Sequence, residues 1–174
     1  MAAVSMKLFG PVFSLTLFFS LAITSKAATP AASGQTAWLS FNGGVAGIFD
    51  SENPPVFSVQ YRFAEKIAFG HPWVELSWAT DGAIFAGAGF AYSVSPDVTR
   101  KWEYTAGVGP GYYDRHQGVN LGSHLEFLSF LEVAYRLDSG NRFQARLAHI
   151  SNGGVSRINP GTELLMLGFA IPLR

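Results

Sequence analysis

The segment "LAHISNGG" (147–154) places a histidine and a serine two positions apart, His149 and Ser151. The first acidic residue that follows is Glu163, fourteen positions after the histidine. A serine, a histidine and a carboxylate can form a hydrolytic triad, in which the serine attacks, the histidine takes its proton and the carboxylate holds the imidazole tautomer. The residue types therefore predict hydrolysis, provided that the fold brings the three side chains together.

The elements that must position these residues alternate with a period of two. In "KWEYTAGVGPGYY" (101–113), the even positions are mostly large and apolar, and the odd positions are small or polar. Successive side chains of a strand point to opposite faces, so this pattern is typical of a strand with one face on an apolar medium. No helical periodicity is sustained after residue 35.

The same alternation recurs in about eight segments separated by turn-forming clusters such as "SENPP", "TDG", "SPD" and "DSGN". Many of these segments have about ten residues, which is the length that a tilted strand needs to cross a bilayer. The expected strands are 36–49, 55–63, 67–79, 83–94, 101–113, 123–137, 142–151 and 162–173.

Two barrel architectures accommodate these strands. A soluble, lipocalin-like carrier would place its large apolar residues inside, whereas a membrane barrel places them outside and pairs polar groups within. The polar face here is thin, and it mixes glycines with charged residues that could form internal salt bridges: Arg62, Glu75, Glu103, Glu126, Glu132, Arg136 and Arg146. We therefore predict an all-β fold, an eight-stranded antiparallel transmembrane β-barrel. Aromatic girdles at the two interfaces are expected from Phe49, Trp78, Trp102, Tyr112 and Tyr135.

The N-terminal residues predict export. One lysine precedes the apolar run "LFGPVFSLTLFFSLAI" (8–23), and small residues follow at the positions that a signal peptidase reads. We expect a cleaved signal peptide over 1–27, a flexible lead-in over 28–35 and a single barrel domain over 36–174.

The amino-acid composition argues against several classes of function. The formal net charge is zero, so no nucleic-acid partner is expected. Cysteine is absent, which excludes disulfides, thiolate chemistry and cysteine-ligated metals. His71, His116 and His124 share no metal-ligand spacing, and we expect neither a metal nor an organic cofactor.

Parity predicts where the three reactive side chains point. In 142–151 the outward set is odd-numbered, from Phe143 to Ser151, and it includes His149. In 162–173 the odd set is apolar from Leu165 onward and is preceded by Glu163. We therefore expect all three on the outer wall, where these two strands connect. The alternative is that strand ends at a membrane interface carry such residues only because they reach water.

The stretch "HISNGGVSRINPGTE" (149–163) resembles the signature of the outer-membrane lipid A 3-O-deacylases, the PagL type. That signature has His-x-Ser-Asn before a Gly-containing loop, then Asn-Pro-Gly, and a Glu fourteen residues after the His, which is the spacing found here. The chain departs from it at Gly153, where a small residue such as Ala is usual, and at its end, "IPLR", which lacks an aromatic assembly signal.

The resemblance implies an esterase of the bacterial outer membrane, acting on lipid A or lipopolysaccharide among outer-membrane lipids. It would hydrolyse the ester-linked 3-hydroxyacyl chain at the 3-position, with Ser151 as nucleophile, His149 as base and Glu163 as the orienting partner. The oxyanion needs preorganised donors, and the candidates are Asn152, Gly153, Gly154 and Asn159, with no ranking among them. The competing function is a non-catalytic small barrel that serves adhesion or membrane integrity, and association into a homodimer is left open.

Overall fold

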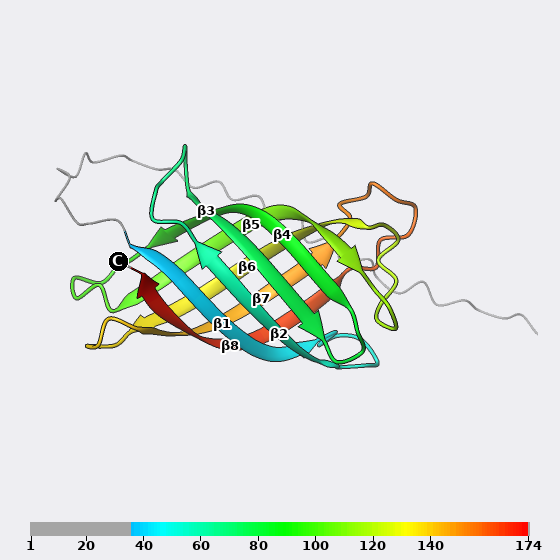
Figure 1. Ribbon diagram of the computed structural model, residues 1–174, viewed down its shortest axis with the longest axis horizontal. Helices are drawn as coiled ribbons and strands as arrows, with labels where there is room; N and C mark the ends of the chain where they lie inside the picture. Colours follow the sequence, from blue (N-terminus) through cyan, green and yellow to red (C-terminus); the bar gives the residue numbers. More distant parts are fainter. Residues whose placement is uncertain (1–35, 174) are drawn as a thin grey trace, which may run out of the picture. The chain divides into compact units, whose positions relative to one another are not determined.

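The computed structural model describes residues 36–173, which form one closed barrel of eight strands (Figure 1). The predicted signal peptide and the predicted lead-in both lie outside these residues. No helix in this part of the chain is long and apolar enough to cross a membrane. The strands are β1 (Ala37–Ala46), β2 (Pro55–Arg62), β3 (His71–Ala79), β4 (Ile84–Val94), β5 (Trp102–Asp114), β6 (Leu125–Arg136), β7 (Arg142–Ser151) and β8 (Thr162–Leu173).

Each strand pairs antiparallel with its neighbour in sequence, and β1 pairs with β8 to close the barrel. The prediction of an eight-stranded antiparallel barrel is therefore confirmed. The largest departures from the predicted strands are at the end of β1 and the start of β3. β1 ends at Ala46, because Gly47 turns the chain with a φ of 67°. β3 begins only at His71, because Ile67 and Gly70 close a tight turn through an isolated bridge.

Ion pairs cross the lumen, which also holds a cluster of buried apolar side chains. Arg146 is fully buried and contacts Glu75 at 2.7 Å and Glu132 at 2.6 Å. Arg62 bonds the second oxygen of Glu132 at 3.0 Å, and Arg142 pairs with Glu103. Buried charges are tolerated when they are paired and hydrogen-bonded in this way. The interior is thus a cross-linked plug and not a ligand-carrying cavity, which is the reverse of a soluble carrier.

The outer wall is apolar along every strand, with large side chains exposed at positions that a bilayer would cover. Aromatic side chains lie near both ends of the wall, as predicted: Trp78 and Tyr112 at one end, and Trp102 in ring contact with Tyr135 at the other. Phe49 is 78% exposed in the β1–β2 loop. These residues are placed where aromatic girdles meet the headgroups.

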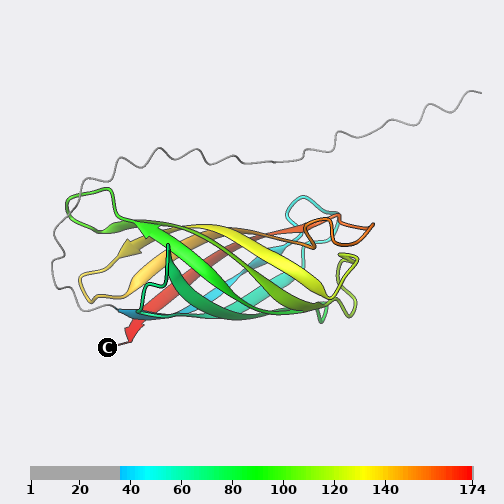
Figure 2. The same cartoon turned by 90° about the horizontal axis from the view of Figure 1, so that it is seen from above.

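The two ends of the barrel differ in their loops. The longest connections, 115–124 and 152–161, lie at the same end as loop 47–54, and Figure 2 shows these three together at the right-hand end. Outer-membrane barrels have long extracellular loops and short periplasmic turns, so this end is extracellular. The first residue of β1 and the last residue of β8 lie at the opposite end.

Candidate active site

The extracellular ends of β7 and β8 bring His149 and Glu163 together. The two residues are register partners, and Nδ1 of His149 lies 3.1 Å from Oε1 of Glu163. Both side chains face outward and keep moderate access to the surroundings, 41% for the histidine and 28% for the glutamate. This contact fixes the ring through Nδ1 and leaves Nε2 directed elsewhere, as a general base in a triad requires.

Ser151 is the last residue of β7 and lies on the same face as His149, two positions along the strand. Its side chain is half-buried and makes no hydrogen bond within residues 36–173. Side chains at such spacing stand about 6.5–7 Å apart at their roots, which a serine and a histidine can span by rotating toward each other. Catalytic hydrogen bonds are often formed only when substrate is bound.

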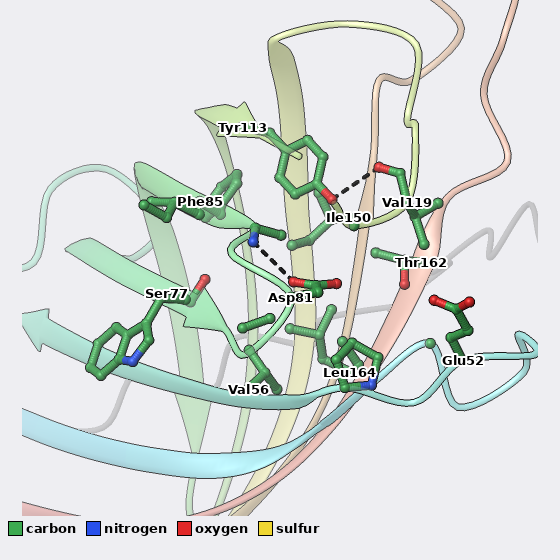
Figure 3. A pocket seen from close by; sticks show the side chains of 18 residues that line it. Glu52, Val56, Ser77, Asp81, Phe85, Tyr113, Val119, Ile150, Thr162 and Leu164 are labelled. Atoms are coloured by element: carbon green, nitrogen blue, oxygen red, sulfur yellow. Dashed lines mark hydrogen bonds between the residues drawn. The ribbon is translucent and has the colours of Figure 1, made fainter. Parts of the chain in front are cut away.

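The neighbours of these residues point the other way. Ile150, Thr162 and Leu164 alternate with the three reactive residues along β7 and β8, and all three are buried. Figure 3 shows them around a pocket in the extracellular mouth of the lumen, which Asp81 and Tyr113 also line. The same two strands therefore present apolar groups and a threonine to the lumen and the reactive groups to the membrane.

The loop that joins β7 to β8 is organised around Asn152, which is fully buried. Its amide nitrogen donates to the carbonyl oxygens of Leu121 at 2.7 Å and Ile158 at 2.6 Å. Its amide oxygen accepts from the backbone N–H of Gly154 at 2.9 Å. Asn152 thus ties loop 152–161 to loop 115–124 directly after Ser151, and its own side-chain donors are committed.

The predicted oxyanion donors are not equivalent in their hydrogen bonds. Asn152 and Gly154 are engaged as described, and the backbone N–H of Asn152 donates to Oδ1 of Asn159 at 3.0 Å. That bond fixes the Asn159 amide and leaves its NH2 group without a protein acceptor in the described part of the chain. The N–H of Gly153 is likewise uncommitted among these residues.

Gly161 sets the space available to the catalytic imidazole. Its φ is 72°, and a β-carbon at this position would clash with Cε1 of His149 and lie 3.1 Å from Nε2. The histidine ring therefore packs over a residue that must be glycine for two reasons, backbone conformation and close approach. Sequence reasoning did not single out Gly161, although the Asn-Pro-Gly sequence before β8 was a signal.

The outer wall of the eight strands is almost free of polar groups. Apart from aromatic side chains and Asp114 at the end of β5, the outward positions of the described strands carry only four polar residues, Ser129, His149, Ser151 and Glu163. These four are neighbours, since Ser129 is the register partner of His149 across β6 and β7. Sequence reasoning missed Ser129, although its odd number placed it in the outward set of β6.

A sequence model of the lipid A 3-O-deacylases (PagL) matches residues 56–172 of this chain. The chain belongs to this family. Its members are esterases, and family membership gives the protein lipid A 3-O-deacylase activity in the outer membrane. A comparison with curated proteins finds no match.

Solved structures with the same fold include the outer membrane enzyme PagL, at 19% identity and a TM-score of 0.60 over 78% of this chain and 99% of that chain. A de novo designed transmembrane β-barrel matches at 15% identity and a TM-score of 0.54, over 81% of this chain and 98% of that one. Neisserial surface protein A (NspA) matches at 13% identity and a TM-score of 0.53, over 82% and 99%. At such identities the likeness concerns the fold.

Proposed function

We propose that this deacylase cleaves the ester-linked 3-hydroxyacyl chain at the 3-position of lipid A through Ser151, His149 and Glu163, working on the outer wall of the barrel. The observation that carries the proposal is the 3.1 Å contact between His149 and Glu163, made by outward-facing side chains on a wall that is otherwise almost free of polar groups. A histidine–carboxylate pair exposed to lipid costs stability and is retained where it does chemistry.

The reaction follows from this geometry. Nε2 of His149 takes the proton of Ser151 as Oγ attacks the ester carbonyl carbon, and Glu163 stabilises the imidazolium through Nδ1. When the tetrahedral intermediate collapses, the bond between the carbonyl carbon and the sugar oxygen breaks, and His149 returns the proton to that oxygen. Water then attacks the acyl-serine in the same way, releasing the fatty acid and restoring Ser151.

For the negative oxygen of the intermediate we propose Gly153 N–H and the NH2 group of Asn159 as donors. Both are free of protein acceptors in the described residues, and both belong to the loop that starts directly after Ser151. Donors held in place before the reaction stabilise the oxyanion most. Asn152 has an indirect role, because the hydrogen bonds of its buried side chain hold the conformation of this loop.

The outward direction of the site suits a substrate that never leaves the membrane. Lipid A can reach the wall by lateral diffusion, with its sugar at the height of Ser151 and its acyl chains along β6, β7 and β8. Below the site these strands expose Leu131, Leu147 and Leu165, between 45% and 50% exposed, as an apolar bed. Neither a lumenal passage nor extraction of the lipid is required.

The test is mass spectrometry of lipid A from cells that produce the full chain, compared with cells that produce Ser151→Ala at equal outer-membrane levels. The expected result is a loss of mass equal to one 3-hydroxyacyl chain with the wild type and unchanged lipid A with the variant. Unchanged lipid A in both would favour a non-catalytic barrel. Equal deacylation in both would disprove the proposed nucleophile.

A further inference from the structure

Ser129 is a hydroxyl on the membrane-facing wall that the mechanism above does not use. It is exposed in the middle of an outward set of β6 that otherwise holds Leu125, Phe127, Leu131, Val133 and Tyr135. Within residues 36–173 its side chain makes no hydrogen bond. An unpaired hydroxyl facing hydrocarbon is unfavourable. A hydrogen-bond partner from a bound lipid would remove this cost.

Its position relative to the proposed nucleophile is defined by the sheet. Ser129 lies directly opposite His149, and Phe127 lies opposite Ser151. Directly opposed residues have β-carbons about 4.5–5.5 Å apart, and diagonal neighbours such as Ser129 and Ser151 about 7–8 Å. Because β6 runs away from the extracellular end, Ser129 is one step deeper in the membrane than Ser151.

An acyl chain whose ester carbonyl lies at Ser151 and whose tail descends the wall must pass Ser129 within its first few carbons. A polar group at that point of the chain would meet a hydroxyl that has no other partner. The 3-hydroxyl of a 3-hydroxyacyl chain stands two carbons from the carbonyl, at this end of the chain. Its oxygen can both donate to and accept from a serine.

We propose that Ser129 recognises the 3-hydroxyl group of the acyl chain being removed, and so selects 3-hydroxyacyl esters over unsubstituted ones. This inference rests on the proposed function, and it adds a specificity residue that lies outside the triad. The contact also sets the depth of the chain, since a hydrogen bond at Ser129 holds the carbonyl at the level of Ser151. One neutral hydrogen bond corresponds to a selectivity of about three- to tenfold.

A purely steric role for Ser129 makes a different prediction. A small residue opposite His149 leaves room for the imidazole, and alanine would serve as well. A role in holding His149 would change the hydrolysis of every ester equally. Only recognition of the hydroxyl changes the ratio of two substrates that differ in that group alone.

The experiment uses the purified full-length barrel and two 3-O-acyl glucosamine lipids of equal chain length, one with and one without the 3-hydroxyl. The wild type should show a kcat/KM about three- to tenfold higher for the hydroxylated ester. In Ser129→Ala this ratio should fall to about one, through the loss on the hydroxylated ester. Ser129→Thr, which keeps a hydroxyl, should retain the preference, and so should Val133→Ala, the matched control on the same face of β6.

Each alternative result has a separate meaning. A wild-type ratio of one, an unchanged ratio in Ser129→Ala, or an equal loss on both esters would overturn the role of Ser129 and leave the deacylase assignment intact. Hydrolysis of neither ester by a folded wild-type barrel would overturn the proposed function, and the role of Ser129 with it.

Discussion

Strand β7 makes two side-chain contacts with carboxylates, at positions three residues apart, and they are built in opposite ways. On the lumenal face, Arg146 is fully buried and bonds Glu132 through both Nε and Nη2, at 3.0 and 2.6 Å. On the outer face, His149 makes one contact with Glu163 and remains 41% exposed. The inner pair uses its donors to hold the barrel together. The outer pair leaves one ring nitrogen free, which is the condition for moving a proton.

Substitution of Ser151 or His149 should reduce the rate of deacylation more than any other change. Ser151→Ala and His149→Ala remove the attacking atom and its base, so we expect deacylation to fall by about three orders of magnitude or more. Neither side chain packs in the lumen, and the barrel should still assemble. Initial rates on lipid A, normalised to the folded fraction on unheated gels, measure this, and near-wild-type activity in Ser151→Ala would refute the assignment.

Glu163→Ala should have a smaller effect than either change, because the histidine keeps its chemistry and loses only its orientation. In a comparable triad, loss of the carboxylate costs roughly a hundredfold less than loss of the serine. The same assay should therefore detect residual activity in Glu163→Ala that Ser151→Ala lacks. If the two variants were equally inactive although folded, Glu163 would be more than an orienting partner.

Gly161→Ala should reduce activity by displacing the imidazole, and we expect a loss of about ten- to a hundredfold, as for other misplacements of catalytic groups. Gly140→Ala is the matched control. Gly140 also has a positive φ, 89°, but a β-carbon there would meet only Pro172 at 3.9 Å, at the periplasmic end. Both variants carry the same kind of backbone strain, so a fall in kcat confined to Gly161→Ala isolates the histidine contact. Equal losses would contradict that contact.

The smallest effect on catalysis is expected from the inner pair. Glu132→Gln removes a charge that pairs with Arg146 and Arg62 in the buried network. Weakening such a network destabilises the fold by about 3 kcal/mol, whereas activity per folded barrel should stay within about twofold of the wild type, since no lumenal group enters the reaction. Urea unfolding and normalised rates test the two parts. A large drop in normalised rate would show that the lumen takes part in the chemistry.

The outward position of the candidate site could be predicted from the two-residue alternation of the strands. Because the side-chain period of a strand is fixed, Phe143 and Leu147 on the outer wall required His149 to be there too, and the structure has it there. The contact between His149 and Glu163 depends on the register of β7 with β8. The fourteen-residue spacing in the sequence does not by itself determine that register.

The alternation could not predict features that depend on loop conformation or on contacts between neighbouring strands. The end of β1 and the start of β3 were set by turns at Gly47 and around Ile67, where local conformation outweighed the alternation. The hydrogen bonds of the Asn152 side chain depend on carbonyl groups in two different loops, and the spacing of residues in the sequence does not predict them. The position of Ser129 opposite His149 depends on the register of β6 with β7.

Covalent labelling can show whether Ser151 is an activated nucleophile that faces the membrane. An alkyl fluorophosphonate, which reacts with activated serines, would be added to outer-membrane vesicles containing the wild type, His149→Ala or Ser129→Ala, and the adduct mapped by peptide mass spectrometry. We expect an adduct on Ser151 in the wild type and in Ser129→Ala, and none in His149→Ala. An adduct on another serine, or undiminished labelling of Ser151 without His149, would contradict it.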